Sequence, residues 1–287
     1  MGARLLGGTY AQAGGEKAKA DVTARAEATS ELRVQLLAGN LPIVVGTVGG
    51  RPGINIMIDT GTSTSVIDAR LAKSLGLELV PGQVQVLNGI FPAPGVWLPD
   101  VELGPVHQTK VPGLVGDLSH LKERFGVPVG LIVGLDVLGE FSFRLDYESK
   151  TLTFGEVCTD GIAVPVNEDS GFAYVNVEVR KKRLRLLVDT GASTVVLFRE
   201  RLDPQMEWLI MTKQGGVQGL GARFKAAGNP PWKSVDITFN GNQRRAKSVY
   251  LVTNAGQFKD FDGLLAVHSL GFHALSYDHE ARVLYLE

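Results

Sequence analysis

The chain contains one cysteine, Cys158, among its 287 residues. A single thiol excludes an internal disulfide and cannot supply the several thiolates of a cysteine-based zinc site. The acidic neighbours Glu156 and Asp160 do not favour the thiolate that a cysteine nucleophile requires. We therefore interpret Cys158 as an unreactive side chain.

Net charge and long apolar runs are also lacking. Lysines and arginines number 29 against 30 aspartates and glutamates, which leaves a formal net charge of -1. This balance gives no electrostatic reason to expect a nucleic acid or an anionic membrane as partner. No apolar run reaches the roughly 18 residues that a membrane-spanning helix needs. The one short basic run, residues 181–185, alternates with leucine at its end, which is typical of the exposed face of a strand.

Motifs for several other chemistries are missing as well. The five histidines form no pair at metal-binding spacing with a carboxylate on an expected helix. The glycine-rich residues 46–50 lack the dinucleotide-binding pattern and precede no expected helix. Neither a phosphate-binding loop nor a Gly-x-Ser-x-Gly nucleophile motif occurs. We therefore expect no metal ion and no organic cofactor.

Glycine and proline are plentiful by comparison. The 35 glycines and 13 prolines predict many turns, as all-β structures require. Hydrophobic residues make up 44% of the chain, enough for one large globular domain or two of ordinary size. Composition therefore favours an all-β fold and leaves the number of domains open.

The tripeptide Asp-Thr-Gly occurs twice, at residues 59–61 and 189–191. Each copy follows an apolar, β-prone run, residues 56–58 and 186–188, so each acid stands at the end of an expected strand. Each copy continues with a small residue and then a serine. The two motifs therefore share one local frame.

The match extends over whole halves of the chain. Asp189 follows Asp59 after about 130 positions. About 75 positions beyond each acid comes a short apolar element, Ile132-Val133-Gly134 in the first half and Leu264-Leu265-Ala266 in the second. Each half then closes with alternating apolar residues around a polar turn, the pattern of a hairpin, at residues 141–154 and 273–286. We interpret this long period as two homologous lobes, residues 31–158 and 159–287.

Residues 1–30 form an alanine- and lysine-containing lead-in to these lobes. Residues 4–13 end in an Ala-x-Ala pattern, which resembles the cleavage region of a secretory signal. This favours a periplasmic or secreted protein, with a cytoplasmic location as the alternative. A signal remnant and an inhibitory pro-segment are both open for the lead-in.

These motifs resemble those of the aspartic protease superfamily, the pepsin-like and retropepsin-like enzymes. The resemblance rests on Asp59-Thr60-Gly61-Thr62-Ser63, on Asp189-Thr190-Gly191-Ala192-Ser193 and on Ile132-Val133-Gly134. It covers most of the chain from residue 41 onwards. It implies two similar β-barrel lobes of the acid protease fold with the active-site cleft between them. The short loops look closer to a fused bacterial retropepsin-like protein than to a large digestive protease.

The resemblance implies that Asp59 and Asp189 are the catalytic pair. Two carboxylates at close range cannot both ionise, so the pair holds one proton. The ionised member can then take a proton from water while the protonated member donates to the scissile carbonyl. The supporting loop residues are Thr60, Gly61, Thr62, Ser63, Thr190, Gly191, Ala192 and Ser193.

The glycines and first threonines of the loops have distinct expected roles. Gly61 and Gly191 allow tight turns in which backbone amides approach the acids. By resemblance, Thr60 and Thr190 hydrogen-bond across the interface between the lobes and lock the two loops together.

The next two positions predict that the acids are inequivalent. Ser63 and Ser193 can each donate a hydrogen bond to an outer carboxylate oxygen and stabilise the charged form. Thr62 offers a further hydroxyl near its acid, whereas Ala192 offers none.

The second half departs from the family pattern at Ala266, where the first half has Gly134. In the family this glycine lets a strand pack directly against the motif loop. An extra methyl group therefore either shifts the backbone slightly or distorts the site. The flap, the hairpin that covers the substrate, has no identifiable key residue, and Trp97 and Phe91 are candidates by position only.

Three further acids, Asp136, Asp146 and Asp278, lie in the aligned elements. Asp146 and Asp278 open the hairpin turns, where aspartate is favoured for local hydrogen bonding. We expect them to be structural.

The sequence thus predicts an aspartic endopeptidase that is active as a monomer. The expected partner is a peptide or protein substrate in extended conformation, held partly by strand-like backbone pairing. The alternative is a catalytically impaired peptide-binding protein with the same fold. A half-active form that needs a second chain is a third possibility.

Overall fold

The structure, a computed structural model, describes residues 31–86, 89–155, 157–169, 171–202, 215–217, 226–228, 234–247, 249–252 and 260–287. Side-chain environments are described for these residues except 85–91, 169, 215–217 and 226–228. The expected lead-in, residues 1–30, lies outside the described residues. The terms first half and second half denote residues 31–158 and 159–287.

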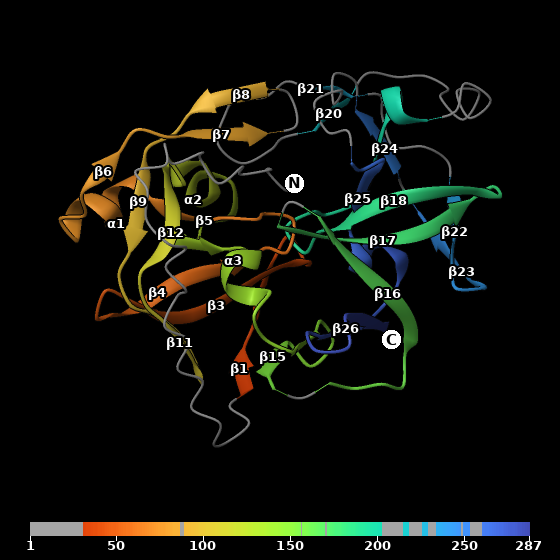
Figure 1. Cartoon of the computed structure of the whole chain (residues 1–287), viewed down its shortest axis with the longest axis horizontal. Helices are drawn as coiled ribbons and strands as arrows, with labels where there is room; N and C mark the ends of the chain where they lie inside the picture. Colours follow the sequence, from red (N-terminus) through yellow and green to blue (C-terminus); the bar gives the residue numbers. More distant parts are fainter. Residues whose placement is uncertain are drawn as a thin grey trace.

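Strands make up 53% of the structure and helices 12%, which confirms the predicted all-β class. The described strands form a 13-stranded sheet, a 10-stranded sheet and two separate two-stranded hairpins (Figure 1). The 10-stranded sheet belongs to the first half alone. Its strands are β2 (Gln35–Leu37), β3 (Leu41–Val48), β4 (Arg51–Ile58), β5 (Ser65–Asp68), β6 (Leu79–Val80), β9 (Gly95–Leu98), β10 (Val101–Leu103), β11 (Val106–Gln108), β12 (Val111–Gly116) and β13 (Leu131–Val133).

The 13-stranded sheet draws strands from both halves. Those from the first half are β1 (Glu31–Arg33), β14 (Phe143–Asp146) and β15 (Thr151–Phe154). Those from the second half are β16 (Ile162–Asp169), β17 (Phe172–Val179), β18 (Lys182–Val188), β19 (Val195–Phe198), β22 (Val235–Phe239), β23 (Asn242–Ala246), β24 (Val249–Val252), β25 (Gly263–Leu265), β26 (Ala274–Asp278) and β27 (Val283–Leu286).

The strand pairing repeats between the halves, as the sequence predicts. The expected opening strands are present as β3 and β17, which pair antiparallel with β4 and β18. Strand β4 pairs in parallel with β13, and β18 pairs in parallel with β25. The two acids continue these ladders, since Asp59 N donates to Val133 O and Asp189 N to Leu265 O, both at 3.0 Å. Each acid therefore starts from a strand that has a partner on both sides.

The turn between β17 and β18 differs from the prediction by one residue. The sequence predicts a turn at Lys181-Lys182, but Lys182 pairs with Val179 and closes a two-residue loop. Arg180 and Lys181 form this loop with φ of 50° and 66°. A two-residue hairpin loop with positive φ at both positions matches the twist of the flanking strands, even where neither residue is glycine.

Short helices fill the connections. They are α1 (Ala69–Ser74), α2 (Ser119–Phe125), α3 (Leu135–Leu138) and the 3-10 turns η1 (Arg199–Arg201) and η3 (Val267–Leu270). Asp68 as a cap and Gly76 as a stop predict a short helix over residues 69–75. Helix α1 confirms it, and the Asp68 carboxylate caps it by accepting from Arg70 N at 3.0 Å. In the described parts of the chain, no helix has both the length and the hydropathy needed to cross a membrane.

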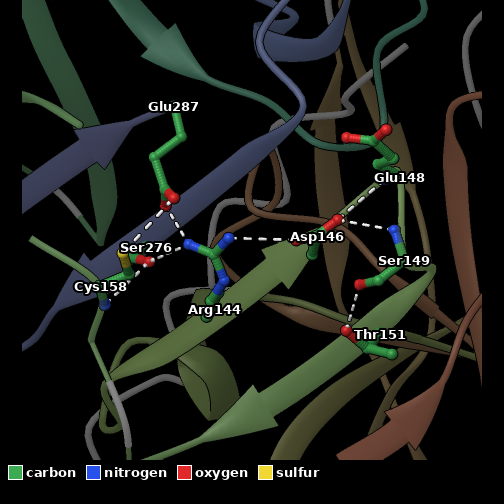
Figure 2. Close-up of polar contacts among 8 residues, drawn as sticks. All are labelled: Arg144, Asp146, Glu148, Ser149, Thr151, Cys158, Ser276 and Glu287. Atoms are coloured by element: carbon green, nitrogen blue, oxygen red, sulfur yellow. Dashed lines mark hydrogen bonds and ion pairs between the residues drawn. The ribbon is translucent and has the colours of Figure 1, made fainter. Parts of the chain in front are cut away.

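The two closing hairpins join the halves. Both are confirmed, as β14–β15 and β26–β27, and β14 pairs antiparallel with β26. Figure 2 shows Arg144 of β14 between two carboxylates, Asp146 on its own strand and Glu287 of the second half. Arg144 Nη2 donates to Asp146 at 3.1 Å, and Nη1 donates to Glu287. A continuous hydrogen-bonded sheet and a charged contact therefore hold the halves together.

One cluster of buried apolar side chains runs through both halves. It includes Ile58 and Val188, the residues directly before the two acids, and their partners Val133 and Leu265. The strands that end in the acids are thus anchored in the core. This anchoring places two carboxyl groups at a depth where water is scarce.

Two hairpins stand apart from the large sheets. They are β7 (Gln83–Val86) with β8 (Gly89–Pro92), and β20 (Gly215–Val217) with β21 (Ala226–Gly228). The sequence predicts hairpin tips or loops at residues 88–95 and 215–221, and β8 and β20 fall within these ranges. Both hairpins lie along the upper edge of the view in Figure 1.

Candidate active site

The two Asp-Thr-Gly loops meet at the interface between the halves. Thr60 N donates to Thr190 Oγ1 at 3.0 Å, and Thr190 N donates to Thr60 Oγ1 at 3.1 Å. Each hydroxyl also donates to a carbonyl of the opposite half, Thr60 to Val188 O at 2.9 Å and Thr190 to Ile58 O at 2.7 Å. These four buried hydrogen bonds form the predicted cross-lobe lock and set the two loops in a symmetric arrangement.

Each acid lies against the glycine of the other loop. A Cβ atom added to Gly61 would lie 2.4 Å from Asp189 Cγ, and one added to Gly191 would lie 2.5 Å from Asp59 Cγ. No side chain larger than hydrogen fits at either position. Asp59 is 0% exposed and Asp189 is 1% exposed. The predicted pair is therefore brought together, buried and centred between the two loops.

Burial and mutual repulsion favour a proton on this pair. Burial, and then the negative charge of Asp189, raise the pKa of Asp59 to about 7. A hydrogen bond from Gly61 N to Asp59 Oδ1 at 2.9 Å acts in the opposite direction but is outweighed. Asp59 Oδ2 is buried with no hydrogen-bond partner among the described residues. Burial and the charge of Asp189 thus both favour the protonated form of Asp59.

The outer loop residues behave differently from the prediction. Ser193 is exposed and makes no hydrogen bond to a carboxylate among the described residues. The Thr62 hydroxyl donates to Thr64 O at 2.9 Å, so it braces its own loop and does not face Asp59. Asp59 Oδ1 accepts a hydrogen bond from Gly61 N at 2.9 Å, and the expected role of Ser63 stays a prediction.

A polar pair beside the first loop was not predicted. Asp136 accepts hydrogen bonds from Ser65 N and Ser65 Oγ, both at 2.8 Å, and Gly134 N donates to Ser65 Oγ at 3.2 Å. Burial raises the pKa of Asp136 to about 7 despite the Ser65 bonds, which lower it. Asp146 and Asp278 cap their hairpin turns, as expected. The signal for Asp136 was its place two residues after the apolar-apolar-Gly element.

The second half does not repeat this pair. Val195 and His268 occupy the positions that match Ser65 and Asp136. The His268 ring packs on the Tyr147 ring, with centroids 4.7 Å apart. The surroundings of the two acids are therefore unequal, as predicted, but the difference comes from these residues as well as from the loops.

The flap candidates have separate outcomes. Trp97 lies in β9, within the 10-stranded sheet, and is 51% exposed. It is therefore not part of the separate β7–β8 hairpin, and its role as a flap residue stays a prediction. Phe91 lies in β8, but its side chain is outside the described residues.

In the parts that the structure describes, no three His, Cys, Asp or Glu side chains are grouped so that they could hold a metal ion.

The threonine lock yields a first prediction. Thr190→Val keeps the shape of the side chain but removes an acceptor for Thr60 N and a donor for Ile58 O. We expect it to lower the free energy of unfolding by about 2 to 4 kcal/mol, because two buried backbone groups lose their partners. Thr190→Ser, the matched control, should stay within about 1 kcal/mol of the wild type. Equal unfolding midpoints for the two variants in urea would contradict this role.

Comparison with known proteins agrees with this geometry for part of the chain. The aspartyl protease family model matches residues 44–137, a segment that contains Asp59 and Gly134. The second motif lies outside the matched segment. No curated protein matches the chain. The match supports the aspartic protease superfamily, whose members are hydrolases, at this coarse level.

Proposed function

We propose that this chain is a single-chain, two-lobed aspartic endopeptidase in which Asp59 and Asp189 activate water. The observation that supports this most directly is the mutual seating of the acids, each against the glycine of the opposite loop. The match to the aspartyl protease family supports the same superfamily from the sequence side. Residues 31–158 and 159–287 are the proposed lobes.

The proposed reaction uses one carboxylate and one carboxyl group. The carboxylate takes a proton from water as the water oxygen attacks the scissile carbonyl carbon. The carboxyl group donates a hydrogen bond to the carbonyl oxygen, which gains negative charge. The tetrahedral intermediate then breaks its C–N bond and the amine leaves with a proton from the pair. Neither a covalent enzyme adduct nor a metal is required.

The proposed substrate is an extended segment of peptide or unfolded protein. Strand-like backbone pairing is the usual way for a β-rich cleft to hold such a segment. Because both acid-bearing loops come from one chain and lock to each other, we propose that the monomer is the active form.

The proposal predicts a loss of hydrolysis as the pH rises through about 7. The reaction needs one proton on the pair, and the raised pKa of Asp59, about 7, sets the upper limit at which that proton is held. We expect kcat/KM for a denatured protein or a peptide library to fall about tenfold per pH unit above this limit. The measurement is cleavage by the purified chain from pH 3 to pH 9, with and without a statine-type transition-state mimic.

Three outcomes would contradict this proposal. Peptide binding without cleavage at any pH would replace it with the peptide-binding hypothesis. Activity confined to a dimer peak in gel filtration would overturn the monomer. Cleavage that the statine-type mimic leaves unchanged would point to a contaminating protease of another class.

A further inference from the structure

We propose that Asn40 is a positioning residue for the second Asp-Thr-Gly loop. Its side-chain hydrogen bond crosses the interface between the halves and takes the place of a backbone hydrogen bond that Ala266 prevents. The inference rests on the proposed function for its kinetic consequence. Its structural part, that Asn40 and Ala266 compensate for each other, is independent of catalysis.

In the first half, the loop is held by its own half. Leu135 N donates to Thr62 O at 2.9 Å, so the residue after the apolar-apolar-Gly element binds the motif loop directly. This contact requires glycine at position 134. A Cβ there would lie 2.7 Å from Thr62 O and 2.9 Å from Thr62 Cγ2, both far closer than such atoms approach.

In the second half, alanine stands where that glycine would be. Ala266 has ψ of 95°, whereas Gly134 has ψ of -169°, so the backbone turns away from the loop at this point. Among the described residues no bond joins Val267 N to Ala192 O, the pair that matches Leu135 and Thr62. The absence of a side chain beyond Cβ at Ala192 also removes the Cγ2 contact that threonine would make with the Ala266 methyl.

The Ala192 carbonyl, which lacks a bond from Val267 N, accepts a hydrogen bond from the other half instead. Asn40 Nδ2 donates to Ala192 O at 3.1 Å, in a buried contact between residues 152 positions apart. Asn40 itself is 8% exposed. It ends the short turn between β2 and β3, where Ala38 and Gly39 have φ of 51° and 83° and Asn40 N donates to Leu37 O at 3.1 Å. The turn therefore places the Asn40 side chain against the second loop.

The position of the second half that corresponds to Asn40 has no side chain. The residue at this position is Gly171, with φ of 78°, and a Cβ built there would meet Ser63 Cβ at 3.4 Å. Each loop thus has one source of support for the matching carbonyl. At the first loop, Gly134 permits the hydrogen bond from Leu135 N, which belongs to the same half. At the second loop, Asn40 of the opposite half supplies the hydrogen bond.

The hydrogen bond from Asn40 to Ala192 O affects the acids because Ala192 directly follows Gly191. Gly191 is the residue against which the Asp59 carboxyl group packs. Without the Asn40 bond, a buried carbonyl has no partner and the loop is free to move relative to the carboxyl pair. A shift of about 1 Å in a catalytic group is enough to lower a rate about 100-fold.

The experiment is a double-mutant cycle of Asn40→Ala and Ala266→Gly. We expect Asn40→Ala to lower kcat/KM about 10- to 100-fold, mainly through kcat. Ala266→Gly alone should leave kcat/KM within about threefold, because the Asn40 bond remains. The double variant should recover most of the loss, because glycine allows Val267 N to reach Ala192 O. A double variant no better than Asn40→Ala alone would overturn the proposal.

Two further measurements keep the outcome decisive. Asn55→Ala is the matched control, since Asn55 Nδ2 also donates to a carbonyl, Pro128 O at 2.8 Å, but away from the loops; it should leave kcat/KM unchanged. NMR titration of ¹³C-labelled aspartate carboxyl groups provides a readout without turnover. If the wild type cleaves nothing, the proposed function fails. The inference about Asn40 can still be tested, because the titration of the carboxyl pair should change in Asn40→Ala and return to the wild-type curve in the double variant. An unchanged titration in Asn40→Ala would overturn it.

Discussion

Replacing Asp59 by asparagine should lower kcat/KM by at least about 10³-fold, because the pair then lacks one of the two groups that move protons during the reaction. Asparagine has nearly the same shape as aspartate, and Gly61 N retains an oxygen acceptor in place of Asp59 Oδ1. The loss should therefore appear in kcat, with KM changed little. Asp189→Asn should have an effect of the same order.

The same substitution should make the protein more stable above pH 7. The pKa of Asp59 is raised from 3.8 to about 7 in the folded protein. The native state therefore binds more protons than the unfolded state between these pH values, and the wild type loses stability as the pH rises through this window. Asparagine does not ionise, so Asp59→Asn should be more stable than the wild type by about 2 to 4 kcal/mol at pH 8. At pH 3 the difference should nearly vanish.

Urea unfolding at pH 3, 5 and 8, together with initial rates of peptide cleavage, measures both effects. Asp100→Asn is the control, since Asp100 is an exposed acid of the same half, and we expect it to change neither activity nor the pH dependence of stability. An Asp59→Asn variant that retains more than a tenth of the wild-type kcat would contradict the role of the pair. A variant destabilised at pH 8 would contradict the buried, repelled carboxyl group.

Gly61→Ala should abolish activity while leaving most secondary structure in place. The new Cβ would lie 2.4 to 2.7 Å from the Cγ and both oxygens of Asp189. Real Cβ atoms do not approach so closely, so the loop or the carboxyl group must move. The threonine lock holds the two loops together, and the strain therefore falls on the carboxyl pair. We expect kcat/KM to fall at least about 10²-fold and the protein to lose about 1 to 3 kcal/mol of stability.

The control for this variant is Gly241→Ala. Gly241 also lies in a turn, with open space around the position of a Cβ and φ of 85°. Its replacement tests the general cost of losing a glycine, about 1 kcal/mol, without touching the acids. Circular dichroism confirms folding, and cleavage rates distinguish the variants. Equal activity of Gly61→Ala and Gly241→Ala would show that the loops are not packed as the structure describes.

Much of the fold follows from local patterns. Alternation of apolar residues predicts the opening strands and the closing hairpins, because the period of a strand is independent of its partners. Asp68 predicts the start of α1 because a capping side chain binds an amide in the first turn of its own helix. The threonine lock between Thr60 and Thr190 also followed from the sequence, but only through the resemblance of both motifs to a known family.

Contacts between residues far apart in the chain were not predictable in this way. The pairing of β14 with β26, which merges strands of both halves into one sheet, depends on how the halves pack. The Ser65–Asp136 pair joins residues 71 positions apart, and neither residue has a local pattern that points to the other. The Thr62 hydroxyl was assigned to its acid by proximity in sequence, but in the folded loop it donates to Thr64 O.

The sequence by itself determined that the chain contains two copies of one acid-bearing unit, because repeated motifs, strands and hairpins at a common period are local features. Only the tertiary structure decided how those copies form one site. The burial that raises the pKa of Asp59, the seating of each acid on the opposite glycine, and the reach of Asn40 to Ala192 all arise from packing between the halves. Hydrogen bonds and desolvation depend on distances in space, and a sequence specifies those distances only once the chain has folded.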